Sequence, residues 1–241
     1  MVLPDITNPF FPGIIRGAED TAFERDYFLV SANTDEQIGR ERRLLGALRS
    51  YRADGILLAS SPGSDTSHIR STIAAGVSVV FLDRPVTGVK ADAVLLDNVC
   101  GARECVRHLL HLGHRRIAII TGPLELQNAC ERLQGYEEAL RESDVHVDPN
   151  LILHGDHRLE SGHRLTRDLL NGRLNATAMF VCNGVMSVGV LNAFEELNVQ
   201  CPQDISLATF DDSTLELSSH SQRRLVFFRF RASRPMGASS A

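Results

Sequence analysis

Polar side chains recur directly after the apolar runs of this 241-residue sequence, and they are its best candidates for binding chemistry. They follow five separate runs and comprise Asn8, Asp83 with Arg84, Asp97 with Asn98, Asn183, and Asp211 with Asp212. Carboxylate and amide groups accept from or donate to adjacent hydroxyls, arginine adds a rigid fork of donors, and the ring of Phe10 can pack on the apolar face of a sugar. The set indicates a site for a neutral polyhydroxylated ligand rather than a catalytic centre.

Each of these residues also has a purely structural interpretation. Phenylalanines such as Phe10 are more often core residues than ligand platforms. Asp83, Asp97 and Asp211 are equally well explained as turn formers or helix caps at strand ends. Arg132, inside a helical segment, has the ordinary interpretation of an exposed helix residue. Only the recurrence after several apolar runs favours binding.

The apolar runs predict the elements that position these residues. The apolar residues in these runs are continuous rather than alternating with polar ones, and this is typical of parallel strands covered on both faces. The runs span residues 27–32, 55–59, 78–82, 93–96, 116–121, 151–154, 178–182 and 205–210. Segments with helical spacing lie between them and include residues 35–51, 127–143, 159–170 and 187–197. Alternating strands and helices predict a doubly wound α/β fold. We expect two lobes, residues 1–98 and 99–212, and an atypical tail, residues 213–241.

Composition and motifs exclude several other classes. The net charge of −5 is unlike that of a stand-alone nucleic-acid binder, and no apolar run approaches the length of a membrane span. The five cysteines contain no CxxC pair, so we expect neither disulfides nor a zinc site. His108, His111 and His114 allow metal binding, but charge placement at a helix end is favoured. No cofactor motif or nucleophile arrangement is present, so no cofactor and no enzyme activity are expected.

Seven fragments, in order, resemble the LacI/GalR family of transcriptional regulators. They are residues 3–11, 54–58, 83–85, 97–98, 112–118, 132–136 and 210–212. The resemblance implies a periplasmic-binding-protein-like fold of two Rossmann-like lobes, with a sugar or nucleoside effector bound in the cleft between them. By the same resemblance the ligand contacts are Asn8, Phe10, Asp83, Arg84, Arg132, Asn183 and Asp211. An Arg132→Ala change is then expected to abolish effector binding and leave the fold intact.

The resemblance also implies a cytoplasmic homodimer that binds operator DNA through a helix-turn-helix headpiece, which we expect to be absent from this sequence. A sugar-binding protein of a transporter is the alternative, and the basic corner within residues 112–120 favours the regulator. Gly184 departs from the family pattern, where an Asp follows Asn183. Residues 213–241 also depart from it and are expected to be out of frame or disordered, although residues 225–230 suit an edge strand.

Overall fold

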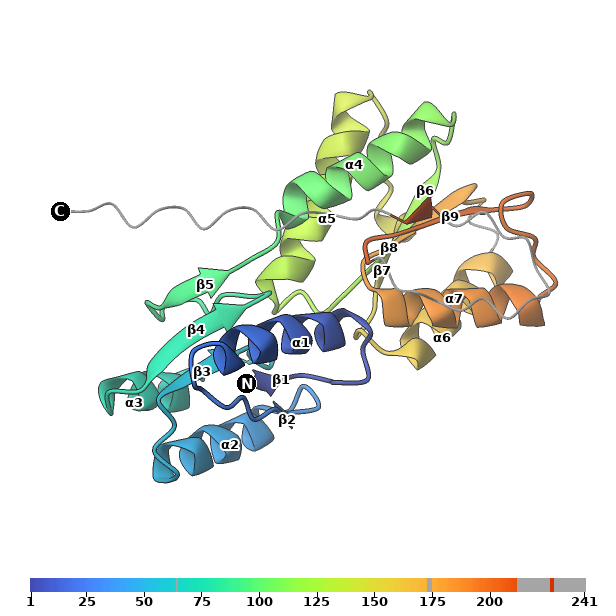
Figure 1. Cartoon of the computed structure of the whole chain (residues 1–241). Coiled ribbons are helices and arrows are strands. Elements are labelled where there is room, and N and C mark those ends of the chain that lie inside the picture. Colours follow the sequence, from blue (N-terminus) through green and yellow to red (C-terminus); the bar gives the residue numbers. More distant parts are fainter. Residues whose placement is uncertain (64, 173–174, 212–225, 228–241) are drawn as a thin grey trace. The chain divides into compact units, whose positions relative to one another are not determined.

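Two compact α/β units make up the described part of the chain. The computed structural model describes residues 1–63, 65–172, 175–211 and 226–227. Unit 1 contains residues 1–97, and unit 2 begins at Asn98 (Figure 1). Each unit holds a five-stranded sheet in which all neighbouring strands are parallel. The predicted atypical tail lies outside the described residues, except for residues 226–227.

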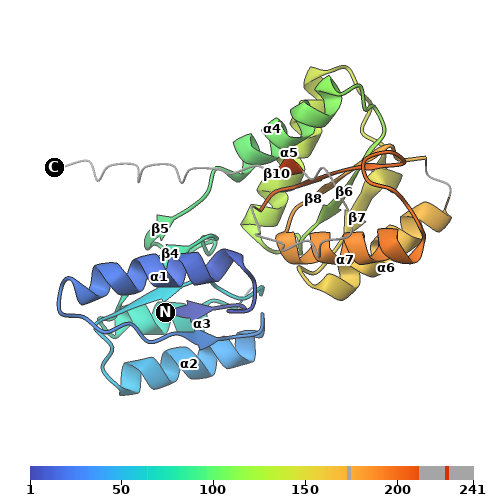
Figure 2. The same cartoon turned by 45° about the vertical axis from the view of Figure 1, so that its right-hand side comes forward.

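Unit 1 alternates strands and helices from its first residues onward. Its elements are β1 (Val2–Leu3), α1 (Phe10–Phe23), β2 (Ala32–Asn33), α2 (Ile38–Ser50), β3 (Gly55–Leu58), α3 (Ser67–Ala74), β4 (Ser78–Leu82) and β5 (Asp92–Val94). The strand order is β2-β1-β3-β4-β5. Helix α1 covers one face of this sheet, whereas α2 and α3 cover the other (Figures 1 and 2).

The two faces of this sheet carry separate apolar clusters. On the α1 face, Leu3 and Leu82 pack with Phe11. On the α2 and α3 face, buried strand residues pack with Leu45 and Ile69. Because successive strand side chains point to opposite faces, an apolar residue at every position satisfies both faces at once. This is why the runs 55–59 and 78–82 lack alternation.

Unit 2 repeats the same plan. Its elements are α4 (Asn98–His111), β6 (Ile117–Thr121), α5 (Gln127–Glu142), the 3₁₀ turn η1 (Pro149–Leu151), β7 (Ile152–His154), α6 (Leu159–Asn171), β8 (Ala178–Val181), α7 (Gly184–Glu196), β9 (Ser206–Thr209) and β10 (Val226–Phe227). The strand order is β10-β9-β8-β6-β7. Helices α4 and α5 cover one face and α6 and α7 the other (Figure 1).

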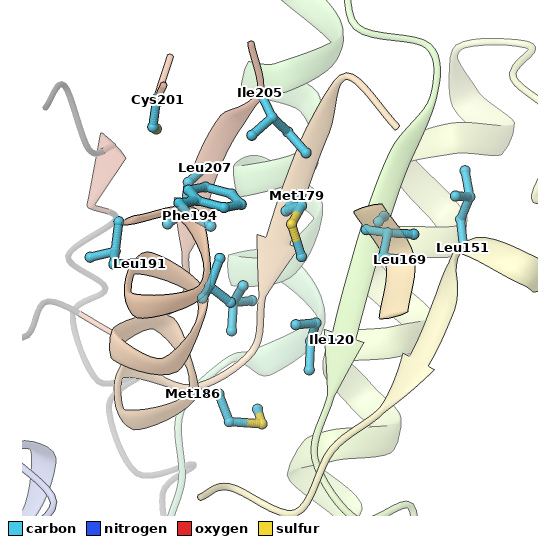
Figure 3. Packing of buried hydrophobic residues seen from close by; sticks show 13 residues of the cluster. Ile120, Leu151, Leu169, Met179, Met186, Leu191, Phe194, Cys201, Ile205 and Leu207 are labelled. Atoms are coloured by element: carbon cyan, nitrogen blue, oxygen red, sulfur yellow. The ribbon is translucent and has the colours of Figure 1, made fainter. Parts of the chain in front are cut away.

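Helix α7 supplies much of the core on its side of the sheet. Figure 3 shows Met186 and Phe194 of α7 on the side of the helix that faces Ile120 and Met179 of the strands. On the opposite face, Gly135 of α5 lies against α4 so closely that an added Cβ would overlap the carbonyl of Val99. Absence of a side chain at Gly135 therefore sets the spacing of the α4–α5 layer.

Two strand predictions have contrasting outcomes. The predicted strand over residues 27–32 is wrong for most of its length, because β2 contains only Ala32–Asn33 and Phe28 is 90% exposed. The backbone N–H of Ala32 donates to the carbonyl of Met1, and the register pairs Val2 with Ala32 and Leu3 with Asn33. The edge strand suggested within 225–230 is confirmed as β10, which pairs with β9.

None of the described helices is long and apolar enough to cross a membrane.

Candidate functional site

The strand order predicts where each unit binds a ligand. Counted within each unit, both sheets have the order 2-1-3-4-5, whose topological switch point lies between the first and third strands. Ligands of open α/β sheets bind beyond the carboxyl ends of the strands at that point. In unit 1 these strands are β1 and β3, followed by Asn8 and Ser60. In unit 2 they are β6 and β8, followed by Gly122 and Asn183.

Asn8 and Phe10 lie between β1 and the first turn of α1. The Oδ1 of Asn8 accepts a hydrogen bond from the backbone N–H of Phe10, the first residue of α1, at 3.1 Å. The ring of Phe10 is half-buried and meets the ring of Phe11 edge-on, with centroids 5.0 Å apart. Phe11 itself is a core residue. The core thus fixes the Phe10 ring at the predicted position after β1.

Asp83 and Arg84 form a buried charged corner directly after β4. Asp83 adopts a left-handed conformation, with φ of 64°, and Arg84 is only 4% exposed. Both Nη atoms of Arg84 donate to the carboxylate of Glu36 at 3.0–3.1 Å, and its Nε lies 3.5 Å from the Oδ2 of Asp83. Burial acts to lower the pKa of Arg84, but the charges of Glu36 and Asp83 outweigh burial and raise it.

A buried polar network that the sequence interpretation missed supports this corner. Arg84 Nη1 also donates to the carbonyl of Ser60 at 3.3 Å. The Oγ of Ser60 donates to the fully buried carboxylate of Glu41 at 3.0 Å, and the Nε2 of His68 lies 2.7 Å from the same carboxylate. A signal existed, because Glu41 precedes Leu45 by one helical turn and therefore lies on the inner face of α2.

Arg132 is a buried residue of α5 rather than an exposed helix residue. Its Nε donates to the Oδ1 of Asn98 at 2.9 Å, and its Nη1 donates to the carbonyl of Cys182 after β8. The guanidinium carbon lies 3.8 Å from the centre of the Phe210 ring, which follows β9. The amide of Asn98 in turn donates to Glu131 at 2.9 Å. Arg132 therefore joins two strand ends to the start of α4.

Asn183 and Asp211 both cap helix α7. The Oδ1 of Asn183 accepts from the N–H of Met186 at 3.0 Å, and the Oδ2 of Asp211 accepts from the N–H of Gly184 at 2.9 Å. A carboxylate at a helix N-terminus is favourable because it complements the helix dipole. Asp211 thus supplies the carboxylate that Gly184, having no side chain, lacks.

His157 is a further residue at the switch point of unit 2 that the sequence interpretation missed. It has a left-handed conformation, with φ of 66°. Its ring lies against Gly122, where an added Cβ would overlap the imidazole. The nearest signal in the sequence was the strand predicted over residues 151–154.

The basic corner at residues 114–116 lies at the opposite, amino-terminal edge of the sheet. His114 bonds the hydroxyls of Thr177 and Ser206, just before or at the starts of β8 and β9, at 3.0 Å each. Arg115 donates to the carbonyl of Leu110 at 2.9 Å near the end of α4, and Arg116 pairs with Asp148 at 3.3 Å. Among the described residues no cluster of three or more His, Cys, Asp or Glu side chains forms a metal site. The hydrogen bonds of His114 and Arg115 and the ion pair of Arg116 indicate that this corner holds the starts of the strands in place.

Comparisons with known proteins relate the chain to transcription regulators. Residues 106–225 match the periplasmic binding protein-like domain family. The chain is 33% identical over 219 residues to the ribose operon repressor of Escherichia coli (strain K12), covering 91% of this chain and 66% of the repressor. The chain thus spans slightly less than two thirds of that relative.

Solved structures give the same result. The transcription regulator CcpA of Lactococcus lactis superimposes with a TM-score of 0.81 at 30% identity, covering 88% of this chain and 78% of CcpA. The Cra regulator of Pseudomonas putida, solved with fructose 1-phosphate, superimposes with a TM-score of 0.82 at 27% identity. The match covers 93% of this chain and 82% of the Cra chain.

Proposed function

The chain belongs to the LacI/GalR family of transcriptional regulators, and on this premise we propose that it is the effector-sensing part of a repressor. The proposed effector is a sugar or nucleoside, which binds without being chemically converted. The proposed contacts are Asn8, Phe10, Asp83, Arg84, Arg132, Asn183 and Asp211. The transporter alternative is less well supported, because the relatives are transcription regulators.

The arrangement around Arg132 is the observation that carries this proposal. A buried arginine fixed by an amide, a carbonyl and an aromatic ring is a rigid donor at two strand ends of one sheet. In unit 1, Arg84 is fixed in the same manner after β4. Both units therefore hold their polar groups in place before a ligand arrives, which lowers the entropy cost of binding.

The names of the relatives suggest the first ligands to try. One relative is a ribose operon repressor, and another was solved with fructose 1-phosphate. We therefore propose a thermal-shift screen of pentoses, hexoses, nucleosides and sugar phosphates, followed by calorimetry with every compound that stabilises the protein. A ligand present at 100 times its Kd stabilises the folded state by about 2.7 kcal/mol, which such a screen detects.

A Phe10→Leu variant tests the site itself. Leucine keeps the apolar contact with Phe11 but removes the flat ring, so affinity for a sugar should fall about tenfold. Phe23→Leu is the matched control, since Phe23 ends the same helix and is 72% exposed. Equal affinities for the two variants would remove Phe10 from the proposed contacts.

A second copy of the chain is the partner we propose for an exposed apolar patch in unit 1. Tyr27, Phe28 and Val30 are 56%, 90% and 67% exposed, and they precede the edge strand β2. Apolar residues beside an open sheet edge favour association with another chain. Sedimentation equilibrium should show a dimer that Phe28→Ser weakens and Tyr51→Ser, at another exposed aromatic residue, does not.

Operator DNA is the partner we propose for the whole regulator rather than for the chain alone. The chain spans 66% of the length of the ribose operon repressor. In an electrophoretic assay we expect the purified chain to leave operator-sized duplexes unshifted at physiological salt, in keeping with its net charge of −5.

A further inference from the structure

We propose that the effector is uncharged, so that a sugar or nucleoside binds and its phosphate ester is rejected. This inference rests on the proposed function and narrows its ligand class. It follows from how the described charges are distributed in each unit. Arg84 and Arg132 are each accompanied by two carboxylates, and at the N-termini of α1 and α7 backbone N–H groups bond side-chain oxygens.

In unit 1 the positive charge of Arg84 is more than balanced. Glu36 accepts two-pronged hydrogen bonds from its guanidinium, and the carboxylate of Asp83 lies 3.5 Å from its Nε. Both carboxylates contribute to the raised pKa of Arg84. The three side chains together therefore carry a net charge of −1, which repels an anion.

Unit 2 has the same balance around Arg132. Asn98 bridges Arg132 to Glu131, because its Oδ1 accepts from the arginine and its Nδ2 donates to the carboxylate. The second carboxylate is that of Asp211, which directly follows Phe210, whose ring centre lies 3.8 Å from the guanidinium carbon. One arginine is thus again combined with two carboxylates.

At the helix N-termini that follow β1 and β8, side-chain oxygens already accept hydrogen bonds from backbone N–H groups. Phosphates in α/β proteins usually bind to the free N–H groups at such positions. In α1 the N–H of Phe10 bonds Asn8. In α7 the N–H of Met186 bonds Asn183, and the N–H of Gly184 bonds the carboxylate of Asp211. A phosphate would have to displace these caps, one of which is itself an anion.

Two further arginines near strand ends are accompanied by acidic residues as well. Arg40 forms an ion pair with Asp35, which follows β2. Arg158 follows the edge strand β7 and lies in the sequence between Asp156 and Glu160. A phosphate monoester carries a charge of about −1.5 to −2 at pH 7, and Asp35 opposes the positive charge of Arg40.

Calorimetry at low ionic strength with matched pairs of compounds tests the inference. The pairs are D-ribose and D-ribose 5-phosphate, D-fructose and D-fructose 1-phosphate, and adenosine and its 5′-monophosphate. We expect at least one neutral compound to bind, and to bind about tenfold or more tightly than its own phosphate ester. A phosphate ester that binds as tightly as its neutral partner, or more tightly, overturns the inference and leaves the proposed function standing. If no neutral compound and no ester binds, the proposed function fails and this inference fails with it.

Charge-neutralising variants test its physical cause. Glu36→Gln removes one of the two charges beside Arg84, so the preference for the neutral compound should shrink about tenfold. Glu131→Gln makes the same change near Arg132 and serves if the first variant does not fold. Glu24→Gln, at the exposed end of α1, should leave the preference unchanged. A preference that neither Glu36→Gln nor Glu131→Gln reduces would overturn the charge argument.

Discussion

Replacing Arg132 by alanine should destabilise unit 2 by about 3–5 kcal/mol, in addition to weakening effector binding. The side chain is only 5% exposed. It makes two hydrogen bonds from a charged donor, each with a net value of about 1.5–3 kcal/mol. Its contact with Phe210, at 3.8 Å, adds about 2 kcal/mol when desolvated. These terms overlap, so the expected loss is smaller than their sum. The burial and contacts of Arg132 therefore predict that this variant weakens the fold, which the helical position of Arg132 in the sequence did not indicate.

Urea unfolding followed by circular dichroism measures this loss. Arg141→Ala is the control, because Arg141 lies on the same helix, its side chain is 60% exposed and it pairs with Glu137; the expected cost is about 0–1 kcal/mol. Arg132→Lys keeps a charge over Phe210 but loses the fork of donors, so its loss should be intermediate. If Arg132→Ala and Arg141→Ala have the same free energy of unfolding, the structural role assigned to Arg132 is refuted.

Three further predictions concern packing, pH and thiol reactivity. Gly135→Ala should destabilise the protein by about 1–3 kcal/mol because α4 blocks the new methyl group. Gly46 is also a helical residue but has open space around it, so Gly46→Ala should stabilise the protein by about 1 kcal/mol. Urea titrations measure both changes. Burial lowers the pKa of His114 below its usual 6.5. Just below pH 6.5 the unfolded state therefore binds more protons at this residue than the folded state does. The free energy of unfolding should therefore fall as the pH drops through 6.5, and fall less in His114→Gln. Burial raises the pKa of Cys182 to about 12, so iodoacetamide at pH 8 should label the exposed Cys130 in the folded protein and reach Cys182 only in urea; equal labelling rates would contradict this burial.

The sequence was sufficient to predict the alternating α/β elements, because burial on both faces imposes a simple pattern. The runs 78–82 and 117–121 are continuous apolar segments and form β4 and β6. The predicted helix over residues 127–143 ends one residue early, at Glu142. The strand predicted over 27–32 was wrong, because pairing depends on the partner strand, which is not a property of the run itself.

The contacts of the candidate residues could not be predicted, because the partners are distant in the sequence. Glu36 and Arg84 are separated by 48 positions, and Asn98 and Arg132 by 34. Whether an arginine on an amphipathic helix lies inside or outside depends on small neighbours and on the ends of strands from other parts of the chain. Sequence periodicity gives the face of the helix but does not give the identity of the group opposite it.

Arg84 and Arg132 hold strand ends together, so any substitution there changes both the proposed effector site and the fold. A loss of binding in such a variant is ambiguous unless the folded fraction is measured. Carboxylates at the edge of the network, such as Glu36 beside Arg84 and Glu131 beside Asn98, offer a cleaner separation. Their amide variants keep shape and some hydrogen bonding while removing one charge, so a change in ligand preference at constant stability can be attributed to electrostatics.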